Sequence, residues 1–267
     1  MKRKLKKEPI VILLIILSLV VGFIIINNKP KKHESNKVKK VVKEKTTNDK
    51  KNKKEEPLRE GEELVAMTSK GYRVTRLNDI YYVDGILIVN KTYPLPSTYQ
   101  PQDPYKEITS DYLYGGDYIE KSVMEAYLKM KDDALKEGLS LKISSGYRSY
   151  KVQIDLYNNY VARDGKDAAD KYSARAGHSE HQSGLCFDLN GTNKNFIETK
   201  EGKWLNDNCY KYGFILRFPS GSEDKTGYMY EGWHFRYVGE ELALKLYNNG
   251  NWISMEEYYG LSSMYNN

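Results

Sequence analysis

The sequence predicts an α+β domain with a small, mainly antiparallel sheet and flanking helices, preceded by one transmembrane helix and a disordered tether. Three observations predict this arrangement. Residues 10–26 form an uncharged apolar run, residues 27–60 are rich in lysine and contain no aromatic side chain, and from residue 80 onward helical and strand patterns alternate. An alternation without a regular period or an internal repeat is typical of an α+β domain rather than of a doubly wound sheet.

The apolar run is long enough, with its flanks, to anchor the chain in a membrane. A helix rises about 1.5 Å per residue and a bilayer core is roughly 30 Å thick. The run ends at Ile26 without a small-residue cleavage site, so we expect an uncleaved signal anchor at 9–26, with a cleaved signal peptide as the alternative. The basic cluster ahead of it favours a cytoplasmic tail at 1–8. The expected location is therefore the cell membrane, single-pass, with residues 61–267 on the extracellular face.

The net charge of +6 is unevenly distributed along the chain. Residues 1–57 contain seventeen Lys and Arg against six Asp and Glu, which leaves twenty-five against thirty for residues 58–267. Residues 27–60 carry too few apolar side chains to fold, and we expect a disordered tether there. Because phosphate recognition needs a basic face on the folded domain itself, we expect no nucleic-acid partner. We also expect a monomer.

The expected domain covers about residues 80–250, and its elements can be justified in order. Residues 81–90 predict a strand region with a turn at Asp84-Gly85, residues 120–137 place apolar side chains at helical spacing, and residues 139–145 alternate as a strand does. Ser149 is a suitable cap for a helix at 149–161. The later patterns predict strands at 184–190, 213–217 and 233–238, and helices at 201–211 and 239–248.

The predicted strand at 184–190 follows a stretch that is rich in reactive side chains, RAGHSEHQSGLCFDLN at 175–190. Strand alternation puts Phe187 on the core face and Cys186 and Asp188 on the other. A buried carboxylate must be hydrogen-bonded or must ligate an ion, and His181 in the preceding turn can fold back beside it. This stretch is therefore a candidate half-site.

A second cluster, YEGWHFR at 230–236, supplies Glu231 and His234. These two residues are an odd number of positions apart and would face opposite ways on an ideal strand, but Gly232 offers a turn that would bring both to one site. Two imidazoles, one carboxylate ligand and one spare carboxylate are the inventory of a catalytic zinc site with a position open for water.

These residues resemble a known group of zinc peptidases. Ser179-x-His181-x-x-Gly184-x-Cys186-x-Asp188, followed by Glu231-x-x-His234, is similar to the SxHxxGxAxD and ExxH motifs shared by lysostaphin, D-Ala-D-Ala carboxypeptidases and hedgehog. Within that group, the SGYRS, SEHQSG, GFILRFP and EGWHFRYVG segments resemble the VanY-type D-alanyl-D-alanine carboxypeptidases. The resemblance covers about residues 85–245.

The resemblance implies a role for each matching residue. Zn²⁺ would be held by His181, Asp188 and His234, and Glu231 would be the general base that later protonates the leaving amine. Arg148 would stabilise the oxyanion or the terminal carboxylate of the substrate. The substrate implied is a peptidoglycan stem peptide ending in D-Ala-D-Ala, which would lose its last residue. The residues expected to contact it are Ser179, Gln153, Tyr147 and Trp233.

Cys186 is where the chain departs from that motif, which has alanine at this position. We weigh three interpretations: a small buried residue, a disulfide with Cys209, and a fourth zinc ligand that would close the site. His178, in the same stretch, is expected to be a satisfied core residue.

Three other functions remain compatible with the sequence. One is a peptidoglycan endopeptidase of the same zinc group. Another is a non-catalytic, zinc-stabilised cell-wall binding module, although a structural site has no need of the spare carboxylate of Glu231. The third is a serine enzyme built on Ser179 or Ser183 with a neighbouring histidine.

Overall fold

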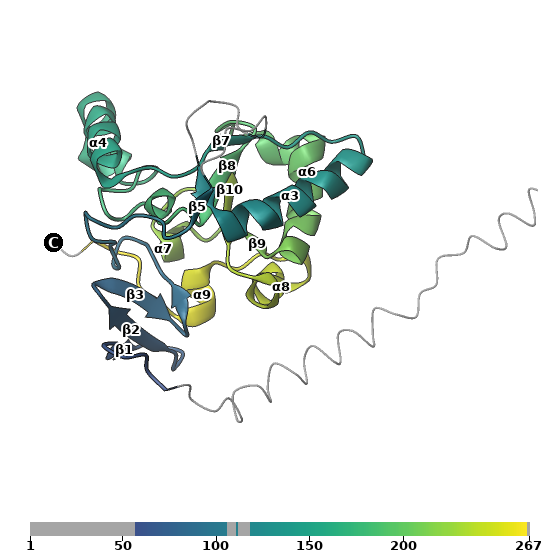
Figure 1. Ribbon diagram of the computed structural model, residues 1–267. Helices are drawn as coiled ribbons and strands as arrows, with labels where there is room; N and C mark the ends of the chain where they lie inside the picture. The colour runs from purple at the N-terminus through teal and green to yellow at the C-terminus, as the bar shows by residue number, and fades with distance from the viewer. Residues whose placement is uncertain (1–56, 106–110, 112–117, 266–267) are drawn as a thin grey trace, which may run out of the picture. The chain divides into compact units, whose positions relative to one another are not determined.

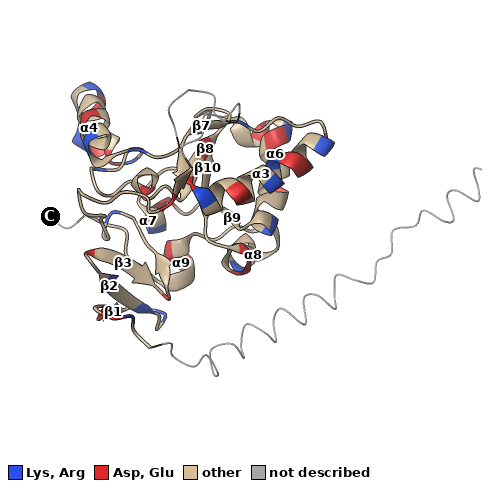
Figure 2. Ribbon diagram, viewed as in Figure 1, with Lys and Arg blue, Asp and Glu red and all other residues tan. Residues whose placement is uncertain are grey.

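The computed structural model describes residues 57–105, 111 and 118–265, and Leu58–Asn267 form one compact unit. The expected membrane anchor and most of the expected tether lie outside the described residues. Within the described part of the chain, every helix is too short or too polar to cross a membrane. Figure 2 shows acidic and basic residues interspersed along the outer helices of this unit.

The described strands form three sheets in which every pairing is antiparallel (Figure 1). The first has the order β1-β2-β3-β4, the second β7-β8-β10-β9, and the third pairs β5 with β6. The strands are β1 (Glu63–Met67), β2 (Arg73–Leu77), β3 (Ile80–Val83), β4 (Ile86–Leu87), β5 (Pro104–Tyr105), β6 (Ile119–Glu120), β7 (Ile143–Ser145), β8 (Cys186–Leu189), β9 (Phe214–Phe218) and β10 (Glu231–Tyr237).

Helices flank these sheets, as the sequence predicts. The α-helices are α3 (Lys121–Lys136), α4 (Tyr150–Asp164), α5 (Lys166–Ala169), α6 (Lys200–Asn208), α7 (Glu223–Thr226), α8 (Glu240–Tyr247) and α9 (Met255–Tyr259). The described part of the chain also contains four short 3-10 helices: η1 (Glu180–Ser183), η2 (Phe196–Glu198), η3 (Cys209–Tyr212) and η4 (Asn248–Gly250).

The main core lies between α3 and one face of the β7-β8-β10-β9 sheet. The buried side of α3 includes Val123, Tyr127 and Met130, which belong to the same apolar cluster as Phe187 on β8 and Phe235 on β10. Since side chains alternate along a strand, the residues between these core positions face the opposite side of the sheet. That opposite face carries the reactive groups.

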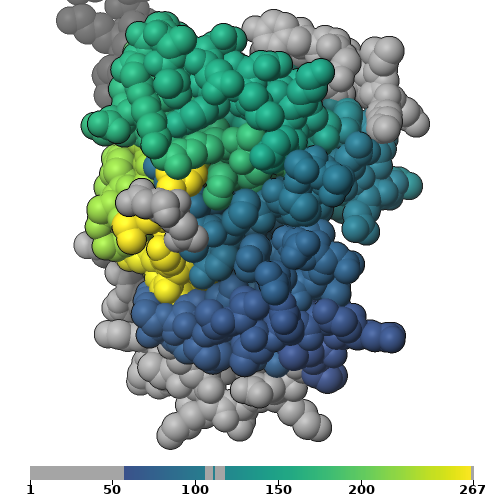
Figure 3. All heavy atoms as spheres, turned by 90° about the vertical axis from the view of Figure 1, so that its left-hand side faces the viewer, coloured from purple at the N-terminus to yellow at the C-terminus, as the bar shows by residue number. Residues whose placement is uncertain are grey.

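A second core joins the two larger sheets. It combines Val83 and Ile88 from the N-terminal segment with Ile215 on β9, and with residues of α8 and α9. In Figure 3 the N-terminal strands (blue) lie at one end of the visible face, the green region of residues 150–185 lies at the other, and C-terminal residues (yellow) lie between them. The C-terminal residues therefore lie between the N-terminal strands and the region of residues 150–185.

The structure refines several predicted elements. The predicted strand region 81–90 contains β3 and β4, separated by a turn in which both Asp84 and Gly85 have positive φ. Ser149 caps α4 by accepting a hydrogen bond from the backbone N–H of Val152. The strand predicted at 139–145 is shorter, at Ile143–Ser145. Strands β1 and β2 and helix α9 were not predicted, because the exposed β1 residues and the brief α9 show no strong periodicity.

Candidate active site

Neighbouring strands place the first two candidate ligands face to face. The antiparallel register pairs His234 on β10 with Asp188 on β8, and it pairs Arg236 with Cys186. Directly opposite residues in a sheet point to the same side, so all four side chains share the face that is turned away from α3. The predicted alternation in 184–190 is confirmed, since Phe187 and Leu189 lie in the core.

Glu231 reaches the same face through an irregularity in β10. The expected turn at Gly232 is wrong, because Glu231–Tyr237 is one continuous strand. Its pairing with β9 instead shifts register between Glu231 and Phe235. Four steps along β10 correspond there to two along β9, so the regular alternation is interrupted in this segment, and Glu231 and His234 meet despite their odd spacing. The Oε2 atom of Glu231 lies 3.6 Å from Nδ1 of His234.

His181 enters the site from η1, just before β8. Gly184 ends this short helix in the left-handed conformation, with φ of 71°, and turns the chain into the strand. The Nδ1 atom of His181 lies 2.6 Å from the carbonyl oxygen of Gly146. A carbonyl only accepts hydrogen bonds, so Nδ1 donates and Nε2 is left with its lone pair. That Nε2 lies 3.5 Å from Oδ2 of Asp188.

His234 is oriented in the opposite sense. Its Nε2 atom lies 3.4 Å from Oε2 of Glu180, and its Nδ1 atom lies 3.3 Å from Oδ1 of Asp188. A neutral ring that donates from Nε2 presents a lone pair at Nδ1. His181 therefore turns its Nε2, and His234 its Nδ1, toward the Asp188 carboxylate.

This donor set fits a cation. Asp188 is 4% exposed, and its Oδ1 atom is buried without a hydrogen-bond partner. Burial opposes the charged form of His234, but Cys186 and Asp188 outweigh it and hold the pKa of His234 well above its ordinary value. A positive charge would therefore stabilise this cluster. A zinc ion is suitable because imidazole nitrogens and carboxylate oxygens are among its preferred ligands.

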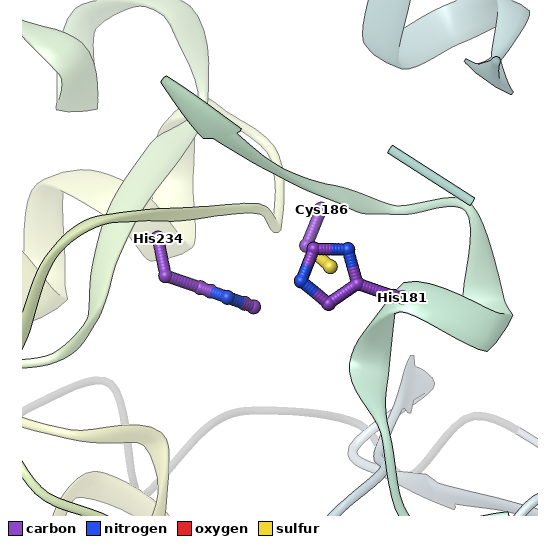
Figure 4. A group of neighbouring side chains, drawn as sticks. All are labelled: His181, Cys186 and His234. Atoms are coloured by element: carbon purple, nitrogen blue, oxygen red, sulfur yellow. The ribbon is translucent and has the colours of Figure 1, made fainter. Parts of the chain in front are cut away.

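Cys186 lies in the same cluster. Both cysteines are free, so the disulfide with Cys209 does not form. Three possible ligand atoms, one each from His181, Cys186 and His234, lie within 4.8 Å of one another. Figure 4 shows the three side chains converging from η1, β8 and β10. Burial raises the pKa of the Cys186 thiol, but the two imidazoles outweigh burial and lower it to about 7. Cys186 is thus a small buried residue, which is the first of the three interpretations. Its Sγ atom also lies close enough to the two imidazoles to bind the same metal ion, as the third interpretation requires.

Glu231 has the environment that a general base needs. Burial, together with the nearby Asp188 charge, outweighs the attraction of the two imidazoles and raises the pKa of Glu231 to about 7. Its side chain is 14% exposed and lines the cavity described below. A proton acceptor works best when its pKa lies near the working pH.

Arg148 is held rigidly beside the cluster. Its guanidinium donates to Oε1 of Gln153 at 3.0 Å and to Oγ of Ser145 at 3.1 Å. Gln153 is buried and donates in turn to the carbonyl oxygen of Ala174. The structure thus places Gln153 behind Arg148, where it orients the guanidinium group, whereas the sequence predicted that Gln153 contacts the substrate. Tyr147 stacks on Tyr118, with ring centroids 4.6 Å apart.

A cavity of about 390 Å³ opens onto these groups. Its walls bring together Arg148, Ser179, Glu231 and Trp233 with the three candidate ligands. Other lining residues have no motif in the sequence that marks them, among them Tyr160, Arg163, Tyr172 and Lys194. His178 is satisfied, as expected, because its Nδ1 lies 2.9 Å from the carbonyl oxygen of Asn90; its ring also lines the cavity.

The buried charges behind His234 were likewise not predicted from the sequence. Glu180 contacts Arg217 and Arg236, and Arg217 contacts Glu256. Glu180 lies between two residues that the motif does identify, but nothing local indicates that its side chain points inward.

Comparisons with known proteins agree with this geometry. The family model of VanY, D-alanyl-D-alanine carboxypeptidase, matches residues 116–240. YodJ of Bacillus subtilis (strain 168), which is named as a carboxypeptidase, is 40% identical over 201 residues, covering 68% of this chain and 73% of that protein. The chain belongs to the VanY family of D-alanyl-D-alanine carboxypeptidases. It is therefore a carboxypeptidase by family, as the motifs predicted.

Two solved structures of VanY relatives extend the likeness to three dimensions. The LdcB LD-carboxypeptidase has a TM-score of 0.61 and 38% identity, over 70% of this chain and 95% of that one. A point mutant of the vancomycin resistance D,D-pentapeptidase VanY, in complex with Zn(II), has a TM-score of 0.53 and 32% identity, over 64% of this chain and 96% of that one. The mixed α/β fold with antiparallel sheets is thus shared with a protein named as an LD-carboxypeptidase and with one named as a D,D-pentapeptidase.

Proposed function

We propose that this protein is a zinc-dependent carboxypeptidase that removes the C-terminal D-alanine from peptidoglycan stem peptides. The observation that carries the proposal is the convergence of His181, Asp188 and His234 around an unpartnered carboxylate oxygen, with Glu231 at its side. These three side chains would hold the ion. When bound, Zn²⁺ lowers the pKa of a coordinated water and polarises the scissile carbonyl.

The protein's own side chains supply the remaining chemistry. Glu231 accepts a proton from the attacking water and returns it to the departing amine of D-alanine, a transfer suited to its raised pKa. Arg148, braced by Gln153 and Ser145, neutralises negative charge on the substrate, either the terminal carboxylate or the developing oxyanion. Ser179 and Trp233 form the wall along which the peptide lies.

Two scissile bonds fit this proposal. The sequence motifs and the VanY likeness support cleavage of D-Ala-D-Ala at the end of a pentapeptide. The LdcB likeness supports a second candidate, cleavage of the L,D bond that precedes D-alanine in a tetrapeptide, because identity, coverage of this chain and TM-score are all higher for LdcB. Both reactions release free D-alanine and use the same catalytic groups.

Product analysis on defined substrates tests the function and the bond together. Purified protein is incubated with stem pentapeptide, tetrapeptide and cross-linked dimer, with and without a chelator. Free D-alanine that disappears with chelator and returns with Zn²⁺ supports the proposal, and the substrate consumed identifies the bond. Cleavage confined to the dimer would make the protein an endopeptidase. Activity that survives chelation would favour a serine enzyme, and bound zinc without turnover a binding module.

We further propose that the enzyme acts on the extracellular face of the cell membrane. This rests on the apolar run at 10–26 and the basic residues that precede it, together with the wall-linked substrate. Substrate on that face would be within reach of a catalytic unit attached through a lysine-rich segment.

A further inference from the structure

The carboxylate of Glu180 lies directly behind the candidate ligand His234. Glu180 is 4% exposed, and its two oxygens face different partners. Oε1 accepts from Arg217 at 2.8 Å and from Arg236 at 3.1 Å, while Oε2 lies 3.4 Å from Nε2 of His234. One carboxylate thus links an imidazole to two buried guanidinium groups.

The two arginines are themselves held in place. Arg217 forms a two-pronged pair with Glu256 on α9, at 2.7 and 2.8 Å, and Arg236 also donates to the carbonyl oxygen of Leu87 at 2.8 Å. We call Glu180, Arg217, Arg236 and Glu256 the buried charge network. The network contains two carboxylates and two guanidinium groups, so its positive and negative charges cancel. Each of the four residues is at most 4% exposed.

The balance of charges matters because an unpaired buried charge destabilises the folded state. Arg217 and Arg236 both donate to Oε1 of Glu180, so its buried carboxylate is paired with two guanidinium groups. The other oxygen, Oε2, faces Nε2 of His234 and offers it a hydrogen-bond acceptor. An acceptor at Nε2 leaves Nδ1 as the lone-pair nitrogen, which is the one that faces Asp188.

We propose that Glu180 is a positioning residue that fixes the tautomer and orientation of His234, and that Arg217 and Glu256 hold Glu180 in place. The C-terminal helix α9 then becomes part of the metal site, although it lies beyond residues 116–240 that the family model covers. This inference rests on the proposed function, because it takes His234 to be a zinc ligand. What it adds to that function is that zinc affinity depends on side chains that do not contact the ion.

The test is zinc affinity in the full-length protein, measured by competition with a chromophoric chelator. Removing the carboxylate partner of a ligating histidine weakens metal binding about 10- to 100-fold in general, and we expect a rise of that size in the zinc Kd of Glu180→Gln. Glu256→Gln should give a smaller rise. Glu223→Gln, at an exposed position on α7, is the matched control and should leave the Kd unchanged.

A charge-balanced variant separates positioning from folding. Glu180→Gln/Arg236→Gln removes one acid and one base together, so the remaining Arg217–Glu256 pair is neutral. If Glu180→Gln does not fold, this double variant should fold and still bind zinc more weakly. The cobalt-substituted protein adds a spectroscopic signature, since a reoriented His234 should shift the visible absorption bands of the metal.

Folded Glu180 variants with a zinc Kd within about twofold of wild type and an unchanged cobalt spectrum would overturn the inference. Failure of the proposed function looks different, because wild-type protein would then release no D-alanine or would ignore chelators.

Discussion

At the scale of single residues, Glu231 carries the chemical step that the proposed mechanism needs. Glu231→Gln keeps the size of the side chain but cannot accept a proton. We expect kcat to fall about 10²- to 10⁴-fold, the usual contribution of a general base, while bound zinc stays at the wild-type level. Release of D-alanine and metal content measure the two effects. Glu240→Gln, exposed on α8, is the control. Near-normal turnover in Glu231→Gln would remove Glu231 from the role of base.

Cys186 raises a second question at this scale, because its thiol lies beside two candidate ligands. We expect Cys186→Ala to bind zinc within a few-fold of wild type and to stay active, since three protein ligands suffice for a catalytic zinc site. The matched variant is Cys209→Ala, which removes a thiol from the core beneath α3 and should lower stability by about 1 kcal/mol without touching zinc affinity. A loss of zinc in Cys186→Ala of tenfold or more would identify the thiol as a ligand.

At the scale of elements, the junction between η1 and β8 positions His181 against Asp188. Gly184 makes this junction possible, since it adopts a positive φ and an added Cβ would lie 2.8 Å from Cγ of Pro101. The strain of a positive φ costs an alanine about 1 kcal/mol, and overpacking adds about 1–3 kcal/mol. We therefore expect Gly184→Ala to lower the free energy of unfolding by more than either effect alone.

Gly221→Ala isolates the conformational part of that cost. Gly221 has φ of 81°, and nothing lies within 4 Å of its would-be Cβ, so this variant carries the strain without the contact. Urea unfolding of both variants measures the difference. Equal losses would mean that the chain around Pro101 yields without cost and that the junction is not tightly packed.

At the scale of the whole molecule, the described unit and the N-terminal segment differ in charge as well as in pattern. We expect residues 58–267 alone to fold and to release D-alanine in solution, because both apolar clusters lie within this range. The full-length chain should instead sediment with membranes and need detergent for extraction. An unfolded fragment would show that residues 1–57 belong to the fold, and a full-length chain that stays in the supernatant would exclude the anchor. Size-exclusion chromatography of the fragment tests the expected monomer.

Much of the site could be predicted from sequence because the relevant rules are local. Alternation in 184–190 correctly put Phe187 in the core and Asp188 on the opposite face, and helical spacing correctly located α3. The cap at Ser149 and the turn at Asp84-Gly85 follow from the preferences of single residues. The motif resemblance added the pairing of two segments about fifty residues apart, which composition and periodicity do not contain.

The sequence by itself thus determined the sheet-and-helix class, the face of each strand that carries chemistry, and the identity of the candidate zinc ligands. Only the tertiary structure decided how those groups are supported. It brought Glu231 beside His234, placed Gln153 behind Arg148, and connected Glu180 to Glu256 through Arg217. The physical reason is range: periodicity and capping act within a few neighbouring residues, whereas a buried charge is paired with whichever group the folded chain brings beside it.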